Sequence, residues 1–352
     1  MAHRGLKSSR LREALRRTIC DSIRTLFVCS LGIMLFVHLA VGSNDSSSNQ
    51  SRKRNPYEPS ASGRTGGETN NQPQQVRIET QLVSFTVTIT DSRGRFVSGL
   101  TKNSFQVYDN GVKQEIAHFS DEDVPASIGI LFDVSRSMKD RMKQSISALK
   151  RFMDVSHKDD DLFLITFNDR ATLSRDFTTS GNQIIESLEA ILPKGSTALY
   201  DAVYLGVEKV ELGRHPKKAL LIISDGEDNH SRYNGRELRQ RILESDVQVY
   251  AIGLTDAFSE DSDSSKYGRS LLESITDQTG GRAFFPNAYN EQQIIEICAR
   301  IALELRRQYS IGFYPTDKAD DTPHKIEVKL NKAKGLGGVS IRHRAGYQSV
   351  KI

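Results

Sequence analysis

Two patterns of apolar residues alternate through the middle of the chain, from about residue 127 to residue 305. Short, mostly apolar runs predict strands at 127–132, 162–167, 171–177, 218–224, 247–254 and 283–285. Between the strands, apolar residues recur at helical spacing and predict helices at 138–155, 184–191, 197–212, 236–243, 271–279 and 294–305. Repeated strand–helix units predict an α/β fold built on a doubly wound, mostly parallel sheet.

On both sides of this central part the pattern changes to strict alternation. Val83, Phe85, Val87 and Ile89 alternate with serine and threonine, which predicts a half-buried strand. Asp91-Ser92-Arg93-Gly94 predicts a turn, and the pair Asn110-Gly111 predicts a hairpin after a second strand. The C-terminal flank alternates in the same way at 309–313, 326–330 and 339–341. Because so few N-terminal strands make a poor core, we expect both flanks to form one β-sandwich, with the central domain as an insertion.

The N-terminus is basic up to residue 24 and almost wholly apolar from Leu26 to Val41. This order predicts a signal peptide or a membrane anchor within residues 1–42, whose basic end stays in the cytoplasm. Ala40-Val41-Gly42 offers a cleavage site, whereas the apolar run is close to the length that spans a bilayer, so both alternatives stay open. Residues 43–75 are polar and predict a disordered linker. We expect an extracytoplasmic protein that is secreted, periplasmic or anchored in the inner membrane.

Composition excludes several classes of function. The 352 residues carry a net charge of +4, and no basic stripe with interleaved aromatic residues crosses the body, so nucleic acid is not an expected partner. Cys298 is the one cysteine outside the N-terminal leader, which excludes a disulfide-stapled body and a cysteine-rich zinc site. The acidic runs 159–161 and 260–263 lack the order of a calcium loop and are expected to be solvated.

The candidate chemistry lies where predicted strands end. Asp133-Val134-Ser135-Arg136-Ser137 follows the strand at 127–132, and Asp225 follows the strand at 218–224. In the usual strand order 3-2-1-4-5-6 these strands are neighbours, so Asp133 and Asp225 are expected to face each other across one crevice. The loop before the helix at 197–212 brings Thr197 toward the same crevice. The serines and Thr197 are also good helix N-caps, and capping is the alternative interpretation.

Together these motifs resemble the metal-ion-dependent adhesion site of the von Willebrand factor type A (VWA) domain, over roughly residues 125–305. The flanks resemble the bacterial VWFA-related family of acidobacterial type through Gly99-Leu100-Thr101, Phe105-Gln106-Val107, Asp109-Asn110-Gly111 and Tyr309-Ser310-Ile311-Gly312-Phe313-Tyr314-Pro315. The expected organisation is therefore an N-terminal β segment at 76–122, a VWA domain at 123–307 and a C-terminal β segment at 308–352.

The resemblance implies a divalent cation, Mg²⁺ or else Mn²⁺ or Ca²⁺, bound directly by Ser135, Ser137 and Thr197 and partly through water by Asp133 and Asp225. Because neutral hydroxyls leave the positive charge of the ion poorly compensated, an acidic residue of a protein partner can complete its coordination. The expected rim of this partner site comprises Arg136, Ser196, Glu227, Asp228 and His230.

The sequence supports other functions less well. The chain has neither a Gly-x-Ser-x-Gly nucleophile motif nor a phosphate-binding P-loop. Metal-assisted hydrolysis would need a general base, for which Glu227 and Asp228 are the candidates. We therefore expect a binding protein and not an enzyme. The main alternative is a structural or sensory scaffold of the cell envelope in which the metal has a structural role.

Overall fold

The structure, a computed structural model, describes residues 82–254, 263–316, 321–331 and 338–349. These residues all belong to one unit of the chain, residues 75–352. The predictions for the leader at 1–42, the linker at 43–75 and residues 76–81 fall outside the described residues. Of the helices that are described, none has both the length and the apolar character needed to span a bilayer.

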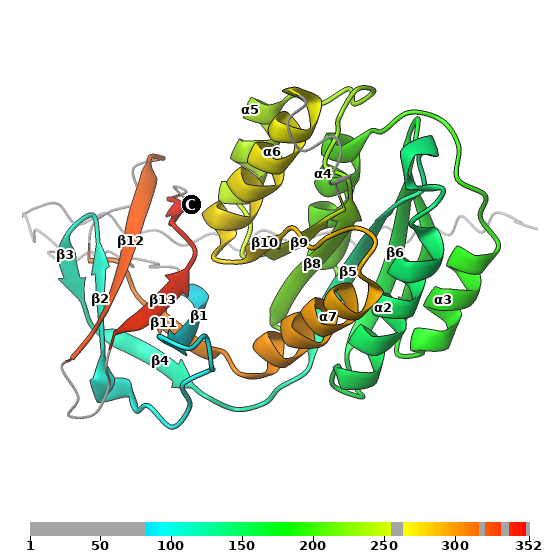
Figure 1. Cartoon of the computed structure of the whole chain (residues 1–352). Helices are drawn as coiled ribbons and strands as arrows, with labels where there is room; N and C mark the ends of the chain where they lie inside the picture. Colours follow the sequence, from blue (N-terminus) through cyan, green and yellow to red (C-terminus); the bar gives the residue numbers. More distant parts are fainter. Residues whose placement is uncertain (1–81, 255–262, 317–320, 332–337, 350–352) are drawn as a thin grey trace, which may run out of the picture. The chain divides into compact units, whose positions relative to one another are not determined.

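Within the described residues, a six-stranded sheet forms the centre of the fold (Figure 1). Its strands are β5 (Ala126–Asp133), β6 (Asp161–Phe167), β7 (Ala171–Thr178), β8 (Lys217–Ser224), β9 (Gln248–Gly253) and β10 (Arg282–Phe284). They lie in the order β10-β9-β8-β5-β6-β7, and neighbours are parallel apart from the antiparallel pair β6 and β7. The predicted fold class and the predicted strand order are thus confirmed, with the first and fourth strands, β5 and β8, side by side.

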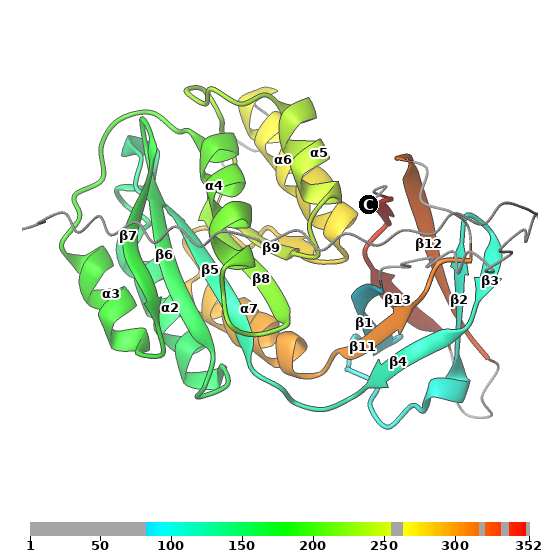
Figure 2. The ribbon, with the colours of Figure 1, turned by 180° about the vertical axis from the view of Figure 1, so that it is seen from behind.

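Helices cover both faces of this sheet (Figures 1 and 2). They are α2 (Met142–Val155), α3 (Gly181–Glu189), α4 (Leu199–Glu211), α5 (Gly235–Leu243), α6 (Asp263–Thr279) and α7 (Glu291–Arg306). One hydrophobic core joins α2, α3 and α7 to one face of the sheet, and another joins α4, α5 and α6 to the opposite face. Because side chains on both faces of β5 and β8 are covered, nearly every position of these strands is buried, and their central residues form continuous apolar runs.

Some helix boundaries differ from the sequence prediction. The helix expected from residue 138 is preceded by a 3₁₀ turn at Arg136–Met138 and begins at Met142. Conversely, α6 begins at Asp263 and not near residue 271, because its first turns are polar and carry no apolar repeat. Apolar periodicity detects the buried turns of a helix, and these boundaries were set by polar turns.

The flanking segments pair with each other. The strands are β1 (Val83–Asp91), β2 (Phe105–Asp109), β3 (Val112–Gln114), β4 (Ile116–Ser120), β11 (Tyr309–Phe313), β12 (Pro323–Leu330), β13 (Val339–His343) and β14 (Gly346–Gln348). Within the described residues they form two four-stranded sheets, β13-β1-β11-β4 and β14-β12-β2-β3. Each sheet mixes strands from before and after the central domain, and the two sheets share one core that includes Val87, Val107, Ile311 and Ile326. A short 3₁₀ turn, Lys102–Ser104, precedes β2.

The turn predictions of the N-terminal flank hold. Asn110 and Gly111 both have positive φ, +46° and +83°, and they connect the antiparallel strands β2 and β3. A two-residue hairpin of this kind needs a left-handed backbone at both positions, which asparagine and glycine tolerate. At the other turn, the side chain of Asp91 accepts hydrogen bonds from the backbone N–H groups of Arg93 and Arg95, each at 2.9 Å.

On the polar face of β1, Thr88 and Thr90 are buried, so the prediction of a half-buried strand is wrong for the C-terminal half of this strand. Thr88 is 1% exposed, and its hydroxyl donates to Oε1 of Glu304 on α7 at 3.2 Å. The same carboxylate oxygen accepts from the Tyr250 hydroxyl at 2.8 Å and is paired with Arg342 of β13. Thr86 and Thr88 of β1 therefore contact polar side chains of the central domain, Gln248 and Glu304.

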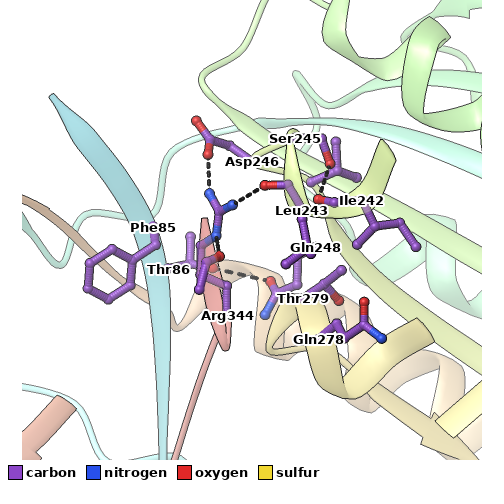
Figure 3. A pocket seen from close by; sticks show the side chains of 12 residues that line it. Phe85, Thr86, Ile242, Leu243, Ser245, Asp246, Gln248, Gln278, Thr279 and Arg344 are labelled. Carbon is purple, nitrogen blue, oxygen red and sulfur yellow. Dashed lines mark hydrogen bonds and ion pairs between the residues drawn. The ribbon is translucent and has the colours of Figure 1, made fainter. Parts of the chain in front are cut away.

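Arg344 makes a second set of polar contacts between the C-terminal flank and the central domain (Figure 3). Its guanidinium donates to the carbonyls of Gly346 at 2.6 Å and Leu243 at 3.1 Å, and it is paired with the carboxylate of Asp246. The cavity beside it, of about 10 Å³, has room for about one water molecule. These contacts are structural.

The acidic run at 159–161 is not fully solvated, in contrast to the prediction. Asp160 and Asp161 are both buried. The carboxylate of Asp160 accepts the backbone N–H of Ala126 at 2.8 Å and that of His157 at 2.9 Å. It thereby ties the start of β5 to the loop before β6. Most of the second acidic run, 260–262, lies outside the described residues.

Candidate metal centre

Asp133 is the last residue of β5, and its carboxylate is completely buried. Oδ1 accepts the backbone N–H of Ser135 at 2.8 Å, which folds the chain into an Asx turn immediately after the strand. Oδ2 accepts the hydroxyl of Ser224 at 2.6 Å. Both carboxylate oxygens are therefore held in place by the neighbouring chain, at the carboxyl edge of the sheet.

Ser135 and Ser137 form a hydroxyl pair beside this carboxylate. Their Oγ atoms lie 3.0 Å apart; Ser135 is buried and Ser137 is exposed. In the described structure, neither the 3₁₀ turn that starts at Arg136 nor α2 has a side-chain N-cap. The alternative interpretation of these serines as helix caps is therefore wrong, because their hydroxyls face each other.

Asp225 follows β8 directly and is also buried. Its Oδ1 accepts the backbone N–H of Glu227 at 3.2 Å, and the Ser137 side chain is a further hydrogen-bond partner. The next residue, Gly226, has φ +84°, and a Cβ placed there would lie 2.7 Å from the carbonyl oxygen of Gly268. Only glycine fits this turn, which points Asp225 back toward the serines.

The two buried carboxyl groups act on each other. Burial is the largest cause that raises the pKa of Asp133, to about 7, and the charge of Asp225 adds to it. Burial likewise raises the pKa of Asp225, whereas Ser137, the Glu227 backbone and Arg141 oppose that rise. Two neighbouring anions in a buried site are unfavourable without a compensating cation. The site thus has the electrostatic character that a divalent ion would satisfy.

Thr197 lies on a loop that makes backbone hydrogen bonds to the serine loop and to the loop after Asp225. Its carbonyl accepts the backbone N–H groups of Asn229 and His230, each at 3.0 Å, and its own N–H donates to Oδ1 of Asn229 at 2.9 Å. Two residues earlier, the carbonyl of Gly195 accepts the N–H of Arg136 at 3.2 Å. Backbone contacts therefore join the Thr197 loop to the serine loop and to the loop after Asp225.

The cap of α4 comes from a distant residue. Oδ1 of Asp228 accepts the backbone N–H of Leu199 at 2.8 Å and that of Tyr200 at 3.3 Å. In the described structure, the residue at the N-cap position, Ala198, makes no side-chain cap. Capping by Ser196 or Thr197 is thus not observed, and Asp228, expected on the partner-binding rim, uses its carboxylate to hold α4.

The remaining rim residues differ in exposure. Arg136 and His230 are exposed, and Ser196 and Glu227 are partly buried. The backbone N–H of Ser196 donates to Oδ1 of Asp169 at 2.7 Å. The sequence analysis did not identify Asp169, although it lies shortly after the end of β6, at the same edge of the sheet as Asp133.

A groove of about 490 Å³ adjoins the serine loop. Apolar groups line part of it, and Arg170 and Lys194 supply positive charge. Its lining residues are Val134, Thr166, Asn168, Asp169, Arg170, Thr172, Ile191 and Lys194. This groove could not be predicted from the sequence, because its walls come from three segments that are distant in the chain.

The donor set fits a hard divalent cation. Side-chain contacts bring together Asp133, Ser135, Ser137 and Asp225, and backbone contacts attach the Thr197 loop. Carboxylate and hydroxyl oxygens are the ligand type that Mg²⁺ and Mn²⁺ prefer. In the described part of the chain, no group of three or more His, Cys, Asp or Glu residues is placed to hold a metal. A site here depends on hydroxyl oxygens as well as carboxylates.

One curated relative has no described function. An uncharacterised protein of Synechocystis sp. is 26% identical over 147 residues, which are 40% of this chain and 35% of that protein. The chain thus spans about a third of the length of the curated relative that it matches.

Several solved structures are similar over part of the chain. An aerotolerance-related membrane protein from Bacteroides fragilis is 18% identical, with 51% of this chain and 98% of that chain covered and a TM-score of 0.40. The PilB minor pilin from Streptococcus sanguinis is 16% identical, with 52% and 62% covered and a TM-score of 0.38. A von Willebrand factor type A protein from Catenulispora acidiphila is 11% identical, with 76% and 75% covered and a TM-score of 0.40.

The family comparison agrees with the fold and with the order of the motifs. The model of the von Willebrand factor type A domain matches residues 127–297, from the first central strand to the middle of α7. This range contains the serine loop, the Thr197 loop and the Asp225 turn. The match ends before the C-terminal flank and begins after the N-terminal one. Residues 127–297 of this chain therefore form a von Willebrand factor type A domain.

Proposed function

We propose that this protein binds another protein through a divalent cation held between Asp133, Ser135, Ser137, Thr197 and Asp225. Mg²⁺ is the favoured ion, and Mn²⁺ and Ca²⁺ are alternatives with the same oxygen preference. The observation that carries the proposal is the contact of a hydroxyl pair with two buried carboxyl groups at the open edge of the sheet. Ser135, Ser137 and Thr197 would bind the ion directly, with Asp133 and Asp225 acting partly through water.

The partner is proposed to contribute an acidic residue. Neutral hydroxyl ligands leave much of the ion's positive charge uncompensated, so a carboxylate from outside is attracted. Basic residues around the site also favour an acidic partner, because Arg136 and His230 are exposed beside it and Arg170 and Lys194 line the adjoining groove. A loop of the partner that carries acidic side chains fits this surface.

A binding role accounts for the site better than catalysis does. Hydrolysis would need a general base within reach of a bound water. Of the two candidates for that base, Asp228 is engaged in capping α4, which leaves Glu227. His230 lies on an exposed loop and contributes to the rim. We therefore propose a protein that is not an enzyme.

We place this function outside the cytoplasm. The support is the order of basic and apolar residues within 1–42, which is typical of exported proteins. If the apolar segment is retained, it would tether the protein to the inner membrane, and if it is cleaved, the protein would be periplasmic or secreted.

The test compares partner capture with and without the ion. Full-length protein is incubated with envelope extract in Mg²⁺ or in EDTA, and captured proteins are identified by cross-linking and mass spectrometry. The proposal expects a partner that is lost both in EDTA and with Asp133→Ala, while thermal unfolding shows that the variant is folded. If the same partner is captured equally in all conditions, or if Asp133→Ala unfolds, the envelope scaffold with a structural metal is the better description.

A further inference from the structure

Arg141 lies against the candidate metal centre, although the metal-site motif includes no basic residue at this position. It immediately precedes α2 and is 7% exposed. One guanidinium nitrogen, Nη1, donates to the carbonyl of Ser137 at 3.1 Å and lies 3.9 Å from Oδ2 of Asp225. Arg141 therefore touches the serine loop and the Asp225 turn at the same time.

Local rules disfavour this position for an arginine. The positive end of a helix dipole repels a cation at its N-terminus, and burial of a guanidinium is costly unless an anion compensates it. The Asp225 carboxylate, itself 9% exposed at the side chain, supplies that compensation. A residue that violates local preferences beside a functional site is expected to act on that site.

We propose that Arg141 sets the metal affinity of this site by balancing the charge of Asp225 when no ion is bound. The inference rests on the proposed function, since it concerns the same metal centre. In the metal-free protein the guanidinium keeps the serine loop and the Asp225 turn together. When a divalent ion enters, the fixed positive charge 3.9 Å from Asp225 opposes it, so that binding is weaker and more readily reversed.

The consequence is a domain that stays folded in both states. A site that holds two buried carboxylates with no other cation nearby would bind its ion tightly and lose stability without it. With Arg141 in place, removal of the ion leaves one carboxylate partly compensated. Arg141 is thus a positioning residue that weakens metal binding and stabilises the metal-free state.

The experiment measures Mn²⁺ affinity by titration calorimetry and thermal unfolding in EDTA, on the full-length protein. Arg141→Gln removes the charge and retains a donor for the Ser137 carbonyl, and Arg141→Met removes both. Arg141→Lys keeps the charge. Lys139→Met is the matched control, because Lys139 is exposed on the same turn and carries the same charge.

Arg141→Gln and Arg141→Met are expected to bind Mn²⁺ about tenfold more tightly and to unfold at lower temperature in EDTA. Arg141→Lys and Lys139→Met should stay close to the wild type in both measurements. If the two neutral variants bind Mn²⁺ with unchanged or weaker affinity, the inference is wrong and Arg141 only braces the loops. If the wild type itself binds no Mn²⁺, Mg²⁺ or Ca²⁺, the proposed function fails, and this inference fails with it. Should Arg141→Met not fold, Arg141→Gln alone decides the outcome.

Discussion

The hydroxyl of Ser224 donates a 2.6 Å hydrogen bond to Oδ2 of Asp133, across the boundary between β8 and β5. Both residues are the last of their strands, and the two strands are parallel neighbours up to the pair Phe132–Ile223. The Ser224 oxygen also accepts the N–H of Gly226 at 3.0 Å, which starts the turn that carries Asp225. One serine thus fixes the first carboxyl group and positions the second.

Asp133→Asn is expected to abolish metal binding and to leave the metal-free fold at least as stable as the wild type. The folded state raises the pKa of Asp133 to about 7, so the metal-free wild type loses stability as the pH rises from about 4 through 7. Asparagine carries no charge to bury, can accept from the Ser135 N–H and can donate to Ser224. We expect a gain of about 1–2 kcal/mol in EDTA at pH 8 and none at pH 4.

Urea unfolding in EDTA at the two pH values measures this difference, and calorimetry with Mn²⁺ measures the loss of binding. The Ser224→Ala variant is the control, because it removes the hydrogen bond and keeps the charge. A variant Asp133→Asn that still binds Mn²⁺ would show that Asp133 is dispensable for the ion.

Asp228→Ala is expected to destabilise the protein because it removes the N-terminal cap of α4. The two backbone N–H groups at Leu199 and Tyr200 then lose their acceptor, at a cost of about 1–2 kcal/mol. Asp228→Asn retains an acceptor oxygen and should cost much less. Chemical denaturation of both variants checks the prediction. Equal stability of Asp228→Ala and the wild type would instead favour the originally expected role of Asp228 on the rim.

Arg342→Met is expected to cost about 2–4 kcal/mol, because it leaves the buried Glu304 carboxylate without its cationic partner. Among the described residues, Oε2 of Glu304 has no hydrogen-bond partner, so few other contacts compensate the charge of this carboxylate. A second substitution, Glu304→Gln, removes the charge and should recover part of the loss. Urea unfolding of the two single variants and the double variant measures the coupling. Additive effects would mean that the pair contributes nothing to the contact between β13 and α7.

His343→Gln is expected to make stability less sensitive to acid. Burial is the main cause that lowers the pKa of His343, although the Arg344 carbonyl and Glu327 oppose it. The unfolded chain therefore takes up a proton near pH 6.5 that the folded chain resists, and stability is lost as the pH falls below that value. Unfolding free energies at pH 7, 6 and 5 measure the slope for both proteins. Parallel slopes would assign the acid sensitivity to other groups.

Apolar patterning along the chain was sufficient to predict the central fold and the order of its strands. Continuous apolar runs such as those ending at Phe132 and Ile223 identify strands covered on both faces, and a repeat of strand and helix permits few topologies. The candidate ligands were found for the same reason. Asp133 and Asp225 follow such strands directly, and neighbouring parallel strands bring their ends together.

Which polar groups near these motifs are buried, and what they contact, depends on how distant elements pack together. Asp228 caps a helix that begins 29 residues earlier, and Arg141 reaches Asp225 across a distance of 84 positions in the chain. Thr88 alternates like a solvent-facing residue, yet it is buried against Glu304. Local periodicity predicts which face of a strand a residue lies on. Whether that face is covered, and by which residues, depends on elements far away in the sequence. For that reason the positions of the candidate ligands could be predicted from the sequence, whereas the groups that hold them and balance their charge could not.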